Sequence, residues 1–142
     1  MSAKPPQPPR ERDEALCPCK SRMKYAACCR PFHQGKAKPE TAEQLMRSRY
    51  SAYFFRLVDY LVETTHPDTR EPNLRKELQS MIHQVKWSFL TIVETSKGGK
   101  DDATGKVEFI AEYFVNGQLD QLHERSRFKR YKGVWKYLDG KA

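Results

Sequence analysis

All four cysteines of this chain lie within thirteen residues, as the pairs Cys17/Cys19 and Cys28/Cys29. Two close pairs of sulfur donors, brought together by one turn of chain, are typical of a tetrahedral four-thiolate zinc site. A segment this short cannot bury a hydrophobic core of its own, so a bound metal ion would hold it together. We therefore predict a zinc knuckle with a structural role, because four protein ligands leave no open position for a substrate.

Two alternatives to zinc exist for the cysteine cluster. An iron–sulfur cluster also takes four thiolates, although usually at wider spacings, and the cysteines could bind no metal at all. Disulfides are disfavoured because adjacent and one-apart cysteines strain the bond geometry. Met1–Leu16 lacks the apolar stretch of a secretion signal, so we expect a cytoplasmic protein with reduced thiols. His33 is expected to be a turn residue or an outer hydrogen-bond donor, since four thiolates already fill a tetrahedron.

The basic charge of the chain is concentrated in two places. Lys and Arg number 26 against 18 Asp and Glu, and the excess lies in residues 1–40 and 123–136. Lys20, Arg22 and Lys24 form either a solvated face or a surface for an acidic protein or phosphate. Sequence-specific nucleic-acid binding is not expected, because no aromatic side chains alternate with these cations. No run of about 18 apolar residues exists, so we expect no membrane span.

The chain divides into three parts by composition. Residues 1–15, rich in proline and charge, predict a flexible leader before the knuckle at 16–35. Residues 36–142 are long enough for one further domain with a hydrophobic core of its own. We therefore expect loss of the metal to unfold the knuckle alone.

The hydrophobic period changes in the middle of this domain. Thr41 and Gln44 form a capping box, after which apolar residues recur at helical spacing. From Val85 the period is two, and Asn116-Gly117 is a strong hairpin signal. These patterns predict helices over 41–55, 58–64 and 73–83, followed by strands over 85–95, 106–115, 118–131 and 134–138. The alternation in the first strand predicts one apolar face, made of Trp87, Phe89, Thr91 and Val93. The order of elements predicts an α+β fold with helices on one face of a curved antiparallel sheet.

The segment Cys17-Pro-Cys-Lys-Ser-Arg-Met-Lys-Tyr-Ala-Ala-Cys-Cys29 resembles the SEC-C motif, the zinc-binding knuckle at the C-terminus of the SecA preprotein translocase. The signature residues of that motif are all present: Cys17, Pro18, Cys19, Ser21, Tyr25, Cys28 and Cys29. Other segments, among them Leu45-Met-Arg-Ser-Arg-Tyr-Ser-Ala-Tyr53 and Leu122-His-Glu-Arg-Ser-Arg-Phe128, are similar to the YchJ family of bacterial proteins. The resemblance implies a zinc knuckle followed by an NTF2-like cone of about three helices on a curved antiparallel sheet.

The chain departs from this family at three positions, where Lys20, Arg22 and Arg30 replace the usual glycines. Glycine relieves backbone strain at positive φ, so the turns of the knuckle are expected to be strained or altered here. The ligand cysteines are intact, so metal binding is still expected. Many relatives carry a second knuckle, which is not expected here because no cysteine follows Cys29.

A cone of this kind encloses a pocket, and several polar residues are candidates to line it: Arg47, Arg49, Tyr50, His66, Glu112 and Glu124. Alternation along 118–131 places Glu124 on the inward face of its strand. We expect Glu124 to pair with Arg47 or Arg49 as a structural ion pair. A polar ligand pocket or a catalytic acid or base are the alternatives. Trp87 and Trp135 are expected in the core.

Two functions follow from these features. In the first, the basic knuckle docks on an acidic protein surface or on the ribosome, as the resemblance to the translocase knuckle implies. In the second, the pocket binds or transforms a small molecule. No nucleotide-binding loop and no catalytic triad signature is present. The sequence therefore favours a zinc-binding interaction module and predicts no particular reaction.

Overall fold

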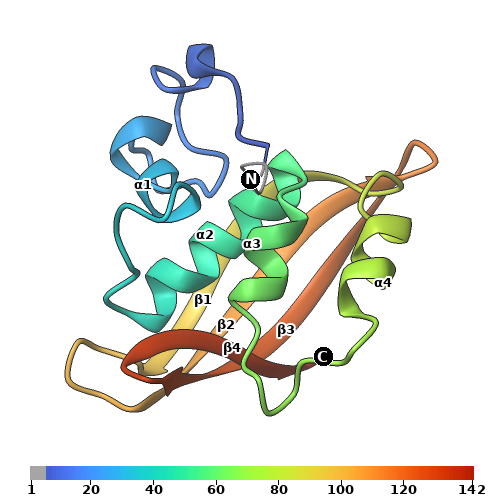
Figure 1. Cartoon of the computed structure of the whole chain (residues 1–142). Helices are drawn as coiled ribbons and strands as arrows, with labels where there is room; N and C mark the ends of the chain where they lie inside the picture. The colour runs from blue at the N-terminus through green and yellow to red at the C-terminus, as the bar shows by residue number, and fades with distance from the viewer. Residues whose placement is uncertain (1–5) are drawn as a thin grey trace.

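The computed structural model describes residues 6–142 and places helices on one face of a curved four-stranded sheet (Figure 1). The helices are α1 (Arg30–His33), α2 (Ala42–Phe55), α3 (Val58–Glu63) and α4 (Leu74–Met81), with short 3₁₀ turns η1 (Arg10–Arg12) and η2 (Tyr25–Ala27) in the N-terminal part. The strands are β1 (Lys86–Lys97), β2 (Thr104–Val115), β3 (Gln118–Tyr131) and β4 (Val134–Lys141). The predicted α+β architecture is confirmed.

The sheet is antiparallel and its strands lie in chain order, β1-β2-β3-β4, so β1 and β4 are its edges. Two-residue turns join the last three strands. Asn116 and Gly117 both have positive φ, as do Lys132 and Gly133, which is the backbone that type I′ hairpin turns require. The predicted hairpin at Asn116-Gly117 is therefore confirmed.

Helix α2 begins where the capping box predicts. The Gln44 backbone N–H donates to Thr41 Oγ1 at 3.1 Å, and the Gln44 side chain accepts from the Glu40 backbone N–H at 2.7 Å. The helix ends at Phe55, and Arg56, which follows it, is in the left-handed conformation. The loop between β1 and β2 also caps this helix, since the Ala42 N–H donates to the Gly98 carbonyl at 2.9 Å. These contacts fix α2 across the sheet.

The prediction that Trp87, Phe89 and Val93 share one buried face of the first strand is wrong beyond Trp87. Register shifts in the β1–β2 pairing leave Ser88 and Val93 as extra residues on β1. Each such bulge reverses which side chains face inward. Trp87 therefore packs against the core, but Phe89 and Val93 point to solvent and Leu90 is buried instead.

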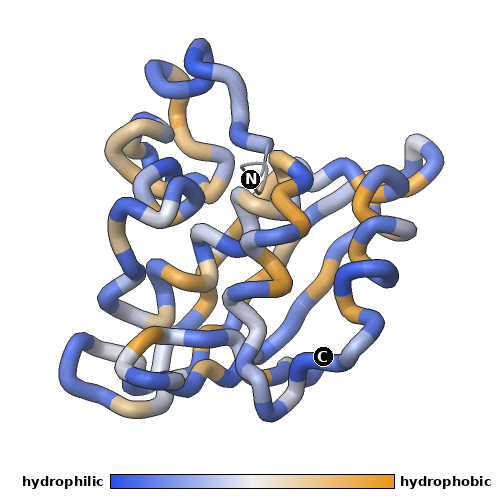
Figure 2. Tube along the Cα trace, viewed as in Figure 1, coloured by the Kyte–Doolittle hydropathy of each residue, from blue (hydrophilic) through white to orange (hydrophobic). Residues whose placement is uncertain are grey.

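The knuckle and the cone share one hydrophobic core. Cys17, Cys19, Cys29 and Tyr25 pack in the same cluster as the apolar residues of α2 and of the sheet, including the fully buried Trp135. Along helices and strands, apolar stretches alternate with hydrophilic ones, as expected for elements that bury one face (Figure 2). Packing of the cysteines in the knuckle is thus coupled to packing in the cone.

The sequence predicts a flexible leader over residues 1–15. Residues 1–5 lie outside the described residues, and residues 6–15 contact the knuckle and helix α1. The Arg30 guanidinium donates to the carbonyls of Pro8 and Pro9 at 2.8 and 2.9 Å and pairs with Asp13. The Gln7 side chain donates to the His33 carbonyl at 3.1 Å. Among residues 6–142, no helix has the length and apolarity that crossing a membrane requires.

Candidate metal centre and two hollows

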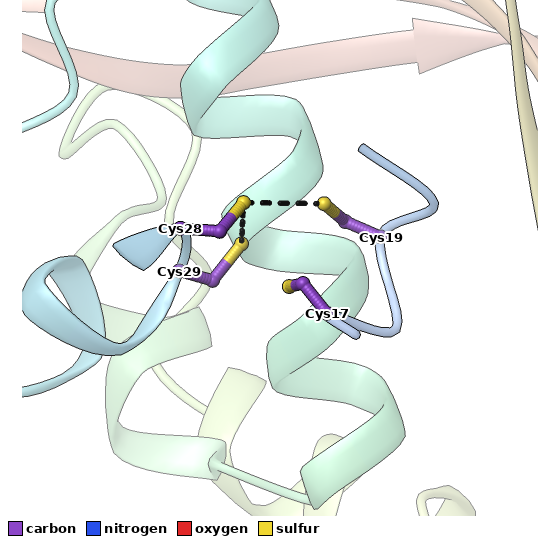
Figure 3. A group of neighbouring side chains, drawn as sticks. All are labelled: Cys17, Cys19, Cys28 and Cys29. Carbon is purple, nitrogen blue, oxygen red and sulfur yellow. Dashed lines mark hydrogen bonds between the residues drawn. The ribbon is translucent and has the colours of Figure 1, made fainter. Parts of the chain in front are cut away.

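The four cysteine side chains point toward one another from two short loops, with helix α2 beside them (Figure 3). Their sulfur atoms all lie within 4.8 Å of one another. The Sγ–Sγ distance is 3.6 Å between Cys19 and Cys28 and 3.8 Å between Cys28 and Cys29. Cys17, Cys19 and Cys29 are buried, and Cys28 is half-buried. The structure therefore brings the four predicted ligands together.

This cluster has the geometry and chemistry of a metal site. Four sulfurs about 2.3 Å from a central ion lie about 3.8 Å apart in a tetrahedron, close to the two short distances observed. The hydrogen bond with Cys17 is the largest cause that lowers the pKa values of the Cys19 and Cys28 thiols, and hydrogen bonds with neighbouring cysteines raise the pKa values of Cys17 and Cys29. Thiolates are the form that binds a metal. The residues present thus fit an ion held by four sulfurs.

Two strained turns shape the first cysteine loop. Lys20 and Arg22 have φ of 66° and 71°, a conformation in which side chains other than glycine are strained by about 1 kcal/mol each. The Cys17 N–H donates to the Met23 carbonyl at 2.7 Å and closes the loop around these turns. The prediction of strain is confirmed at Lys20 and Arg22. It is wrong at Arg30, which opens helix α1 with ordinary helical backbone.

Helix α2 supplies a hydroxyl group that sequence reasoning missed. The fully buried Ser51 donates to Cys29 Sγ at 3.3 Å and lies 3.4 Å from Cys17 Sγ. Ser21 lies 3.1 Å from Cys28 Sγ and is part of the resembling motif. Hydroxyls next to metal-bound sulfurs stabilise their negative charge and orient them. No sequence pattern identifies Ser51 as a neighbour of the cysteines, because it is distant from them along the chain.

His33 links the knuckle to the cone and is not a ligand. Its Nε2–H donates to the Ser48 carbonyl at 2.8 Å, and its Nδ1 accepts from the Tyr25 hydroxyl at 2.5 Å. Burial, more than any other cause, lowers the pKa of His33 to about 4. The imidazole is therefore neutral at pH 7, and its two bonds tie Tyr25 to helix α2.

A basic groove, defined here as the hollow between the knuckle and β1, has a volume of about 520 Å³. Its lining contains four cations and no acidic residue: Arg12, Lys20, Arg22 and Arg47. Exposed Leu16 and Phe89 supply apolar surface, and Lys20 Nζ lies 5.2 Å from the centre of the Phe89 ring. Ser88–Ile92 of the edge strand form one wall. Lys24 lies outside the groove, where it pairs with Glu14 at 2.7 Å.

A second hollow, the cone pocket, lies between α2 and the sheet and has a volume of about 200 Å³. Three of the six candidate residues line it: Arg49, Tyr50 and Glu124. The other three do not. Arg47 contacts the knuckle, donating to the Cys19 carbonyl at 2.7 Å. His66 bonds to the backbone of Asp68 at 3.1 Å, and Glu112 is absent from the lining.

The expected ion pair of Glu124 with an arginine is not formed. Arg47 pairs with Glu43 at 3.1 Å, and Arg49 Nη1 donates to the Leu61 carbonyl and the Thr64 hydroxyl at 3.0 and 2.7 Å. Glu124 accepts only from the Ser126 hydroxyl, at 2.6 Å, among the described residues. Arg49, a predicted partner of Glu124, therefore bonds to Thr64 instead.

Fold and site together define a class of protein, in which a SEC-C motif precedes an NTF2-like domain. A family model for the SEC-C motif matches residues 15–31, and a model for the middle NTF2-like domain of YchJ matches residues 41–140. The chain belongs to the YchJ family. Its relatives carry the designation UPF0225, and one from Serratia proteamaculans is 44% identical in a match that covers 88% of this chain and 82% of the relative.

Two solved structures share this architecture. The solution structure of a SEC-C motif-containing protein from Rhodopseudomonas palustris is 34% identical, with a TM-score of 0.81, and the match covers 89% of this chain and 97% of that one. The crystal structure of a SEC-C motif-containing protein from Psychrobacter arcticus is 27% identical, with a TM-score of 0.76 and coverage of 91% and 83%. The predicted membership of the family is confirmed.

Proposed function

We propose that this protein is an interaction module, in which a structural zinc ion holds the basic knuckle beside the edge of β1 so that both bind an acidic segment of a partner protein. The observation that carries the proposal is the composition of the basic groove. Among the described residues, its lining combines exposed apolar side chains with four cations and no acid, and three of the cations, Arg12, Lys20 and Arg22, have no acidic partner. Such a groove attracts a negatively charged chain and offers it apolar contacts.

Zinc is the metal that this donor set favours. Four thiolates at tetrahedral distances suit zinc, and a closed site with four protein ligands suits a structural role. The contacts of Cys17 and Cys29 with Ser51 would hold such an ion against the cone. The thiols must stay reduced to bind it, which supports a location in the cytoplasm.

An extended acidic segment suits the groove because one wall is an edge strand. Within residues 6–142, β1 pairs only with β2, so its other edge has backbone groups that an incoming strand can bond. Leu16 and Phe89 would contact alternate side chains of that strand, and Lys20 and Arg22 would neutralise its acids. The edge of β1 favours a protein segment over ribosomal RNA, because RNA has no peptide backbone that could extend the sheet.

A synthetic peptide of alternating glutamate and valine tests the proposal by fluorescence anisotropy. We expect the double variant K20E/R22E to lose affinity by about tenfold or more, because it reverses two charges in the groove. The matched variant K24E, outside the groove, should stay within about twofold of the wild type. Binding by the wild type should weaken as salt is raised.

Equal peptide affinities of the wild type and K20E/R22E would contradict docking in the groove. A single-stranded RNA that binds more tightly than the peptide, and that competes with it, would instead favour the ribosome as the partner. Circular dichroism of each variant separates lost binding from lost folding.

A further inference from the structure

The cone pocket carries two opposite charges that do not meet. Arg49 and Glu124 both line it, yet no ion pair joins them among the described residues. Arg49 is buried, and only its Nη1 has a hydrogen-bond partner in the described chain. Glu124 binds Ser126 through Oε2 and leaves Oε1 without a partner. Arg49 therefore has N–H donors, and Glu124 has an acceptor oxygen, that bond to no described residue within one small, largely apolar pocket.

Tyr137 places these two charges at the same end of the pocket. The Arg49 guanidinium lies over the Tyr137 ring, 4.5 Å from its centre. Burial is the largest cause that raises the pKa of Tyr137, and the charge of Glu124 raises it further while that of Arg49 opposes it. Glu124 also lies against β4, the strand of Tyr137, since a Cβ atom at Gly140 would meet its carboxylate group. A donor and an acceptor for one ligand group lie near each other at this end.

The opposite end of the pocket is aromatic and contains unpartnered polar atoms. Trp87 of β1 pairs with Tyr113 of β2, and Glu124 of β3 pairs with Phe109 of β2. Tyr113 and Phe109 are four residues apart on the same strand. At about 3.4 Å per residue, that separates the two ends by about 14 Å along β2. Among the described residues, the Tyr50 hydroxyl and the Trp87 indole N–H are buried without a hydrogen-bond partner. Tyr50 is only 3% exposed, and unpartnered groups so deeply buried are rare in folded proteins.

We infer that the cone pocket binds an uncharged molecule about the size of one aromatic ring that carries a primary carboxamide or an equivalent pair of donor and acceptor. The volume of about 200 Å³ is somewhat larger than the cavity of about 150 Å³ that accommodates benzene. The carboxamide oxygen accepts from Arg49, and its N–H donates to Glu124. The ring lies toward Trp87. This inference is independent of the metal centre and of the basic groove.

Charge explains why the ligand is neutral. A carboxylate would bond to Arg49 but meet the negative charge of Glu124, and an ammonium would bond to Glu124 but meet Arg49. In a pocket of low polarity, either like-charge contact costs more than in water. A carboxamide satisfies both residues and brings no net charge.

Three probes of similar size and different charge test this inference: benzamide, benzoate and benzylamine. The readout is the pair of indole N–H signals in the nitrogen–proton NMR spectrum of the zinc-loaded protein. We expect benzamide to shift the Trp87 signal in a saturable way. The Trp135 signal should stay in place, because its indole N–H already donates to the Glu40 carbonyl at 3.0 Å. Benzoate and benzylamine should bind at least about tenfold more weakly.

The variant E124Q changes the ligand preference while leaving a side chain of the same shape. Without the negative charge, benzoate should gain affinity and benzamide should not, which reverses their order. Failure of benzamide to move the Trp87 signal at millimolar concentration would overturn the inference, as would equal binding of the three probes to the wild type. A dispersed spectrum of E124Q shows that the variant is folded.

Discussion

The hydroxyl group of Ser51, in the middle of helix α2, donates a hydrogen bond to Sγ of Cys29 at 3.3 Å. This bond joins the longest helix of the cone to the metal site of the knuckle. Cys29 and Tyr25 of the knuckle pack in one cluster with Leu45 and Trp135 of the cone. Stability of the two parts is therefore coupled.

Removal of the metal should loosen the cone as well as the knuckle. The shared core leads us to expect a lower midpoint of thermal unfolding and a weaker near-ultraviolet circular dichroism signal, because Trp135 lies in that core. About one equivalent of zinc should be present in the wild type and none in the variant C28S/C29S. If chelation leaves the near-ultraviolet signal unchanged, the cone has a core that is independent of the knuckle.

Replacing Ser51 by alanine should weaken metal binding by about tenfold, since the loss of a hydrogen bond to a metal ligand typically costs this much or more. Competition with a chromogenic chelator measures the affinity. The matched control is S80A in α4, where the hydroxyl of the exposed Ser80 donates to the backbone carbonyl of Glu77 at 2.9 Å. An S51A affinity equal to that of S80A would show that the hydroxyl contributes to packing alone.

Acid should destabilise the protein through His33. Its pKa is about 4 in the folded state, below the value of 6.5 or so in an unfolded chain. The unfolded state thus binds more protons between these values, so the stabilising contribution is complete above about pH 6.5 and is lost as the pH falls toward 4. Its full size is about 3 kcal/mol.

Urea unfolding at saturating zinc, followed from pH 7 to pH 5, measures this loss. Protonation of the thiols also lowers the free energy of unfolding in this range. The variant H33Q lacks the imidazole, so its pH dependence measures the contribution of the thiols alone. The wild type should show the steeper dependence on pH. Parallel curves for the two proteins would exclude the contribution of His33.

Replacing Gly105 by alanine should destabilise the protein by about 2 kcal/mol or more, because an overpacked core cannot absorb the added methyl group. A Cβ atom at Gly105 would lie 2.4 Å from Cα of Gly98, in the loop that caps helix α2. The matched control is G99A, where a Cβ would lie 3.4 Å from the Asp102 side chain. Chemical denaturation compares the two, and similar midpoints would show that the loop can move aside.

Features set by neighbours in sequence were predictable, and those set by distant contacts were not. The capping box of Thr41 and the turn at Asn116-Gly117 depend on a few adjacent residues, and both agree with the structure. The cysteine spacing similarly indicates a four-sulfur cluster. By contrast, the partner of Arg49 depends on how α3 packs on α2, and no local pattern in the sequence encodes that choice.

The burial of β1 shows the same limit. A bulge adds a residue to one strand without altering the alternation of residue types, so the pattern around Ser88 does not reveal it. The inward face changes at that point, and Phe89 faces solvent although its spacing from Trp87 predicts burial. The position of Ser51 beside the cysteines also arises only when the chain is folded.

The outward position of Phe89 affects how a newly made chain behaves. An edge strand with exposed apolar side chains pairs readily with the edges of other chains, and a nearby positive charge opposes such aggregation. Lys20 lies over Phe89, and its loop is anchored by Cys17 and Cys19. If a metal ion holds this loop in place, a chain without the ion would leave the apolar side chains of β1 exposed. The supply of metal during synthesis, and not the stability of the finished fold, would then limit the yield of monomeric protein.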